Sequence, residues 1–178
     1  MKRKTLMLIG SIALVMALIV PISVTAQQQP ERRQGRISLG VDVGALFGTP
    51  DATAFALGLN GDYFLNHNFS VGPLLQVGVT SDLFLFGPSL QLKYTYDFSQ
   101  RLKTTLQGGI GILYGELERR GPDRDDTSFL IPVGPGIEYR LTDDLSIGGT
   151  LLFNFTNLNK VRDENVFVSV LGGLKVRF

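Results

Sequence analysis

The segment Ile37-Ser-Leu-Gly-Val-Asp-Val-Gly-Ala-Leu-Phe47 carries an apolar side chain at every odd position. The even positions between them hold Ser, Gly, Asp, Gly and Leu, so the two sets differ in polarity. Because successive side chains of a β-strand point to opposite faces, this alternation predicts a strand with one apolar face and one mostly polar face.

The same period of two returns seven more times along the chain. The eight predicted strands are Ile37–Phe47, Phe55–Tyr63, Phe69–Val79, Phe84–Phe98, Leu102–Tyr114, Phe129–Leu141, Leu145–Phe155 and Val166–Phe178. Beyond residue 26 no stretch carries a sustained apolar stripe of helical period, and each internal glycine would weaken a helix by about 1 kcal/mol relative to alanine. The sequence therefore predicts an all-β protein.

The segments that join these strands alternate in character. Tight and mutually similar turns follow the second, fourth and sixth strands, at Tyr63–Ser70, Tyr96–Lys103 and Tyr139–Ser146. The other connections are polar and vary in length: Gly48–Thr53, Thr80–Asp82, Glu116–Ser128 and Asn157–Asn165. Short turns at one end and variable loops at the other predict an eight-stranded antiparallel up-and-down β-barrel.

A repeated triplet adds a local expectation within three of the strands. Val71-Gly-Pro73, Phe86-Gly-Pro88 and Val133-Gly-Pro135 each place proline after glycine. Proline cannot donate a ladder hydrogen bond, so bulges or bends are expected there, beside glycines that permit close strand approach.

The N-terminal segment has the features of an export signal. Lys2, Arg3 and Lys4 precede the apolar run Leu6–Val20, and Val24-Thr25-Ala26 resembles a signal-peptidase site. A membrane-spanning helix is the alternative, but the run is shorter than the roughly 20 residues that a helix needs to cross a bilayer. We predict a cleavable signal peptide at 1–26, a flexible periplasmic leader at 27–35 and a barrel domain at 36–178.

Composition excludes several kinds of chemistry. The 178 residues contain no cysteine and one histidine, His67, so disulfides and thiolate metal sites are ruled out and no nucleophile with a positioned base is evident. A net charge of +1 gives no footprint for nucleic acid. Asp123, Asp125 and Asp126 match no calcium-loop spacing. We expect no enzymatic activity, no metal and no cofactor.

The apolar face of the strands could meet either a protein core or lipid. No position of this face within the predicted strands is Asp, Glu, Lys or Arg, and 15 of the 17 Phe and Tyr residues lie on it, most near strand ends. Two aromatic belts around an apolar band are typical of a membrane barrel. A secreted soluble barrel of lipocalin type, which binds a small apolar ligand, is the alternative.

Together these features resemble a known family. The signal, the eight alternating strands, the tight turns and the last strand ending on Phe178 are similar to small bacterial outer-membrane β-barrels such as OmpX, OmpW and the OmpA transmembrane domain. This resemblance implies a monomer in outer-membrane lipid. It also implies that the barrel-assembly machinery reads an alternating signal in the last strand, Val170, Leu174, Val176 and Phe178, although Gly172 departs from that pattern.

The opposite face of the strands would then line the lumen, and it carries charge. The candidate lumen charge network comprises Asp42, Asp62, Lys93, Asp97, Lys103, Glu138, Arg140, Lys175 and Arg177. Eight strands enclose an interior just wide enough for side chains to fill it. Because unpaired buried charge is costly, we favour a mutually paired network that closes the barrel over a conduction path.

Toward the loop end the inward face becomes apolar. The candidate apolar mouth comprises Leu46, Leu83, Leu85, Leu113, Leu117, Leu130, Leu152, Phe167 and Leu171. A mouth that admits a small apolar molecule, as proposed for OmpW-like barrels, is one hypothesis, and simple packing is the other. The predicted role is a structural, surface-interaction or minor solute-permeation protein, with the partners of the loops left open.

Overall fold

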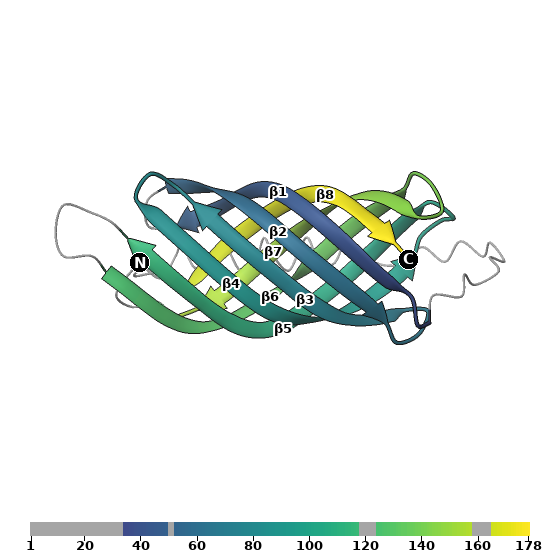
Figure 1. Ribbon diagram of the computed structural model, residues 1–178, viewed down its shortest axis with the longest axis horizontal. Coiled ribbons are helices and arrows are strands. Elements are labelled where there is room, and N and C mark those ends of the chain that lie inside the picture. The colour runs from purple at the N-terminus through teal and green to yellow at the C-terminus, as the bar shows by residue number, and fades with distance from the viewer. Residues whose placement is uncertain (1–33, 50–51, 118–123, 158–164) are drawn as a thin grey trace, which may run out of the picture.

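Eight strands form a closed antiparallel barrel in the computed structural model, which describes residues 34–49, 52–117, 124–157 and 165–178 (Figure 1). The strands are β1 (Ile37–Thr49), β2 (Ala52–Phe64), β3 (Phe69–Val79), β4 (Leu83–Asp97), β5 (Leu102–Leu117), β6 (Arg124–Arg140), β7 (Leu145–Thr156) and β8 (Val166–Arg177). Each strand pairs with its neighbour in sequence, and β8 pairs with β1. The predicted fold class is confirmed. The predicted signal peptide lies outside the described residues.

Three turns share one hydrogen-bond pattern, which explains their similar sequences. The amides of Leu65, Phe98 and Leu141 donate to the carbonyl four residues later, at 2.9–3.0 Å. The side-chain oxygens of Asn66, Ser99 and Thr142 each accept an amide hydrogen bond from the residue three positions on, at 2.8–3.0 Å. Asn, Ser and Thr favour such turns because their short side chains can replace a backbone acceptor. These turns lie at one end of the barrel, hereafter the turn end, beside the C-terminus (Figure 1).

The loop end differs from the prediction in two hairpins. The expected loop Glu116–Ser128 is wrong over much of its length, because β5 and β6 remain paired up to Leu117 and Arg124. The backbone hydrogen bonds between these strands continue beyond the last apolar residues of the outer face, because backbone pairing does not require apolar side chains. The β1–β2 hairpin is also tighter than expected, with Thr49 paired to Ala52 after a register shift at Gly48, whose φ is +75°.

The Gly-Pro triplets do not produce the predicted bulges. Between β2 and β3 the register at Asn60–Leu74 is the same as at Tyr63–Val71, and only the pairs opposite Gly72 and Pro73 are missing. Proline lacks the amide that would complete those pairs. A Cβ on Gly72 would overlap the carbonyl oxygen of Gly61, so glycine allows the neighbouring strand to approach closely where the ladder is interrupted.

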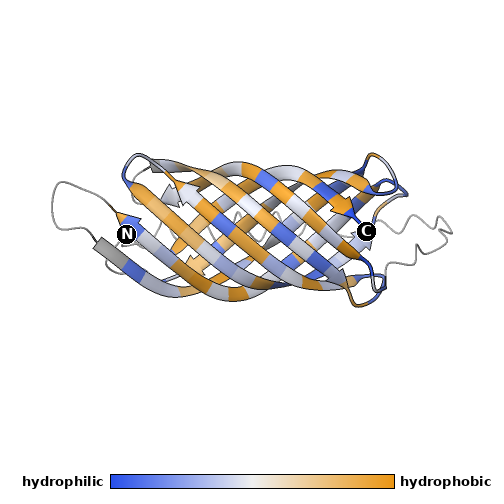
Figure 2. Ribbon diagram, viewed as in Figure 1, coloured by the Kyte–Doolittle hydropathy of each residue, from blue (hydrophilic) through white to orange (hydrophobic). Residues whose placement is uncertain are grey.

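The barrel is apolar outside and polar inside. Hydrophobic and hydrophilic residues alternate along the strands (Figure 2), and Ile110 on the outer face is 71% exposed. Aromatic side chains that include Tyr63, Tyr96 and Phe155 are exposed near the two ends. An apolar outer band between aromatic girdles is the arrangement of a transmembrane barrel. Among the described residues no helix is long and apolar enough to cross a membrane.

Candidate functional site in the barrel lumen

The inward-facing charges meet in one layer near the turn end. Asp62 on β2 lies 2.7 Å from Lys93 Nζ on β4 and 3.0 Å from Lys175 Nζ on β8. Glu138 on β6 lies 3.4 Å from Lys175 Nζ and 3.0 Å from Arg177 Nη2. These five residues form the ion layer, and Lys175 joins its two carboxylates across the lumen.

The ion layer is buried as well as paired. Asp62, Lys93 and Arg177 are each 5% exposed or less. Ser38 Oγ also donates to Asp62 Oδ2 at 3.2 Å, so this carboxylate receives three polar partners. Buried charges persist when counter-charges and hydrogen bonds replace the water they lose.

The other predicted lumen charges lie around the ion layer. Lys103 is 2% exposed and pairs in register with Glu138, and Arg140 is partly buried at the end of β6. Asp97 Oδ2 lies 3.0 Å from Nε2 of His67, the single histidine of the chain. Asp42 lies deeper, where Asn60 Nδ2 donates to its Oδ2 at 2.6 Å.

A cavity of about 50 Å³ lies on the loop side of the ion layer. We call it the chamber. It is lined by side chains or backbone of Asp42, Asn60, Leu74, Lys93, Thr105, Gln107, Gly136, Ile137, Glu138, Gly148, Gly149, Thr150, Leu152, Leu171, Gly173, Leu174 and Lys175. At roughly 10–15 Å³ for each water, the chamber has room for a few water molecules.

Glycines in one paired row create this space. Gly148 is paired with Glu138 on one side and with Gly173 on the other, and Gly173 is paired in turn with Asp42. Gly58 continues the row beyond Asp42. Between Glu138 and Asp42 this row therefore has no side chain that projects inward from β7 or β8. The lumen stays open there.

A neutral polar cluster, which was not predicted from the sequence, crosses the lumen on the loop side of the chamber. Gln76 Nε2 donates to Asn154 Oδ1 at 3.1 Å, Asn154 Nδ2 donates to Ser169 Oγ at 2.7 Å, and Ser169 Oγ donates to Gln76 Oε1 at 2.9 Å. This polar tie joins β3 to β7 and β8. The sequence signal for this cluster is the placement of uncharged amides, Gln76 and Asn154, at inward-facing strand positions.

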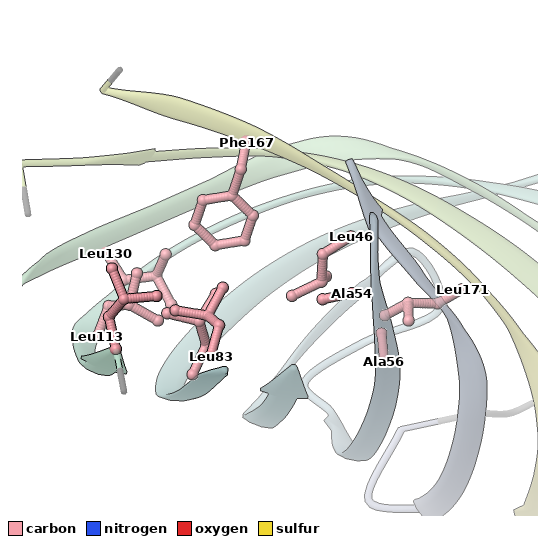
Figure 3. Packing of buried hydrophobic residues seen from close by; sticks show 10 residues of the cluster. Leu46, Ala54, Ala56, Leu83, Leu113, Leu130, Phe167 and Leu171 are labelled. Carbon is pink, nitrogen blue, oxygen red and sulfur yellow. The ribbon is translucent and has the colours of Figure 1, made fainter. Parts of the chain in front are cut away.

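The predicted mouth residues pack together at the loop end, and each is 7% exposed or less. A single buried cluster, the septum, contains eight of them with two alanines: Leu46, Ala54, Ala56, Leu83, Leu85, Leu113, Leu117, Leu130, Phe167 and Leu171. Figure 3 shows these side chains directed from the strands into the barrel interior. Leu152 is fully buried and lines the chamber instead.

The residues of the expected assembly signal lie on the outer face of β8 and at its end. Val170, Leu174, Val176 and Phe178 are exposed, whereas the intervening Lys175 and Arg177 point into the lumen. Of the acidic loop residues, Asp123 lies outside the described residues.

The family of the chain follows from its sequence over nearly the whole length. Residues 12–177 match the model of the outer membrane protein beta-barrel domain. The chain belongs to this family. No curated protein sequence matches this outer-membrane barrel.

Solved structures share the fold of this outer-membrane barrel at low sequence identity. The N-terminal β-barrel domain of Pseudomonas aeruginosa OprF is 12% identical, with a TM-score of 0.64 over 83% of this chain and 100% of that one. Neisserial surface protein A is 16% identical, with a TM-score of 0.63 over 80% and 96%. Ail, the attachment invasion locus protein of Yersinia pestis, is 13% identical, with a TM-score of 0.56 over 82% and 99%. These likenesses establish the transmembrane barrel fold, and the family places the protein in the outer membrane.

Proposed function

We propose that this protein is a monomeric, non-enzymatic outer-membrane barrel that serves envelope structure or surface interaction, with a lumen closed by its own side chains. The observation that carries the proposal is the filling of the lumen, by the ion layer at the turn end and by the septum at the loop end. A barrel filled in this way anchors its loops at the cell surface and offers solutes little passage.

Passage of an ion would have to disrupt both kinds of packing. At the turn end it would separate buried ion pairs, and at the loop end it would enter a cluster of leucines without polar partners. Both steps are costly because the ion would lose its hydration shell, and neither side chains already held in ion pairs nor a leucine cluster would replace it. Of the proposed roles, minor solute permeation is therefore less favoured than envelope structure or surface interaction.

Export and assembly belong to the same proposal. Residues 1–26 act as a cleavable signal, and the assembly machinery reads the outer face of β8. The exposed, alternating apolar side chains of Val170, Leu174 and Val176 support the second point, because they are accessible without unfolding the strand.

Fractionation with conductance measurements tests the proposed role. We expect recovery of the processed protein in outer membranes, a heat-shifted gel mobility and no steady channel in planar bilayers. A soluble periplasmic product would instead support the lipocalin-like alternative, and steady channels in the purified barrel would contradict the closed lumen.

A second candidate function rests on the apolar lining of the loop end. The septum brings leucines from several strands to one place, and its opening would expose a surface that suits a small apolar molecule. Leu113→Asp with Leu152→Asp should abolish binding of an apolar fluorescent probe such as N-phenylnaphthylamine, whereas Leu113→Met should preserve it. Equal probe binding by the unchanged barrel, the double variant and Leu113→Met, all in folded form, would exclude an apolar binding site at the loop end.

A further inference from the structure

The chamber lies between two barriers of opposite chemistry, and this arrangement has a functional consequence. We infer that the ion layer and the apolar loop-end packing close the chamber in series, so that opening either one alone hydrates the chamber from one side without creating a conducting path. The inference rests on the closed lumen proposed above. It adds the position of each barrier and the requirement that both be removed.

The barrier at the turn end lies between the chamber and a second, smaller cavity. Lys93, Glu138 and Lys175 line the chamber, and the same three residues line a second cavity of about 10 Å³ toward the turn end. The ion pairs of Lys175 with Asp62 and Glu138 therefore separate the two spaces.

Lys175 is the residue whose removal opens this barrier most cleanly. It contacts two carboxylates, and each has another cationic partner: Lys93 for Asp62 and Arg177 for Glu138. Removal of the Lys175 side chain leaves two balanced ion pairs and a gap between them. The variant therefore keeps compensated charge in the lumen, which favours folding.

The barrier at the loop end is built in successive layers on β3, β7 and β8. Leu74, Leu152 and Leu171 line the chamber. Two residues farther toward the loop end on each strand stand Gln76, Asn154 and Ser169, the polar tie. The other septum residues lie beyond them, with Phe167 next along β8, whereas Leu171 belongs to the septum and also lines the chamber.

The two barriers stop water for different reasons, so the loss of one leaves the other intact. The ion layer resists because separation of its buried charges is unfavourable, and the septum resists because it has no groups that bind water. The lining of the chamber includes Asp42, Thr105 and Thr150, which can hold water once it enters.

A single introduced thiol can report which barrier is open, because the chain has no cysteine. Thr150 lines the chamber, and Thr150→Cys is nearly isosteric. Gln100→Cys at an exposed turn and Thr127→Cys at the exposed loop end are matched controls for access from each side. The probe is a charged, membrane-impermeant thiol reagent, applied to intact cells for the loop end and to osmotically shocked cells for the turn end.

The barrier variants are Lys175→Ala at the turn end and Leu152→Ala with Asn154→Ala and Phe167→Ala at the loop end. We expect Thr150→Cys alone to react slowly from both sides. Each barrier variant should raise its labelling at least about tenfold from its own side only, which corresponds to about 1.4 kcal/mol in the free energy of opening. Ion conductance should appear only when both sets are combined.

Several outcomes would overturn the inference. Rapid labelling of Thr150→Cys in the otherwise unchanged barrel, labelling from the wrong side, or channels in either barrier variant alone would each do so. Channels in the unchanged barrel would contradict the proposed function as well, whereas channels confined to one single-barrier variant would contradict only the series arrangement. Should the triple variant fail to show the heat-shifted mobility of a folded barrel, Leu152→Ala with Phe167→Ala, which still removes a septum side chain, replaces it.

Discussion

At the scale of single residues, burial and partners decide which of the lumen positions matter for stability. Asp62 is buried and meets Lys93, Lys175 and Ser38 at 2.7–3.2 Å. Asp143 lies in an exposed turn. Two carboxylates of one sequence thus have unequal energetic roles, and their difference arises from the strands that surround each of them.

Asp62→Asn should destabilise the folded barrel by about 3–5 kcal/mol, because Lys93 and Lys175 would stay buried without their shared counter-charge. The urea midpoint of the heat-shifted gel band measures the change. Asp143→Asn is the control and should stay within about 0.5 kcal/mol of the parent. Equal midpoints for the two variants would show that the ion layer contributes little to stability.

Alanine substitutions at two adjacent glycines on β8 should have opposite effects on stability. A Cβ on Gly173, which faces the lumen, would overlap the carbonyl oxygen of Val41, whereas a Cβ on Gly172, on the outer face, would lie 3.7 Å from the nearest atom, the carbonyl oxygen of Gly148. Gly173→Ala should therefore lower the urea midpoint strongly. Gly172→Ala should leave it unchanged or raise it by up to about 1 kcal/mol, since alanine restricts the unfolded chain. The reverse order would contradict the close packing of β8 on β1.

At the scale of elements, the turns and the last strand organise the barrel. The three turns repeat one arrangement in which a short polar side chain accepts an amide hydrogen bond. β8 contributes to every layer of the lumen, with Lys175 and Arg177 in the ion layer, Ser169 in the polar tie and Phe167 in the septum. Closure of the barrel by β8 therefore completes all the layers together.

Ser99→Ala removes the oxygen that accepts the Leu102 amide at 3.0 Å and should destabilise the barrel by about 0.5–1.5 kcal/mol. Gln100→Ala, in the same exposed turn, should have almost no effect. Urea titrations of the two variants in one lipid provide the comparison. A similar loss in both would assign the effect to the turn in general and not to the Ser99 hydrogen bond.

At the scale of the whole molecule, the outer face distinguishes a membrane barrel from a soluble one. Large apolar side chains are exposed along every strand, and the charged and amide side chains gather inside. In water this arrangement would be unfavourable, because apolar surface would contact solvent while polar groups were buried. In a bilayer the same arrangement is stable, since lipid covers the outside.

Ile110 lies near the middle of β5 and is 71% exposed on the outer face. Ile110→Arg should destabilise the barrel in lipid vesicles by about 2–4 kcal/mol, the cost of a basic side chain near the bilayer midplane. Ile110→Leu is the volume-matched control and should be neutral. A soluble barrel would tolerate arginine at an exposed position, so unchanged stability would count against a lipid-facing surface at this height.

Much of the architecture could be predicted from the sequence. Alternation of side chains predicted the eight strands, their order and the inward position of charges such as Lys93 and Glu138, because a period of two is a local property of the chain. The extent of β5 and β6 was wrong, since ladder hydrogen bonds carry the strands past the last apolar residue. The bulges expected at Gly-Pro were also wrong, because the strands omit pairs there and keep their register.

The sequence by itself determined the strand count, the two unlike faces and the class of barrel, since each depends on residue types at short and regular spacing. Only the tertiary structure decided which charges pair, that Lys175 joins two carboxylates, and that Gln76 meets Asn154 and Ser169 across the lumen. The physical reason is register. Closure of the barrel brings side chains from distant strands to the same height along its axis. It also aligns the glycines of β7 and β8 in one row, and the space beside this row is the chamber.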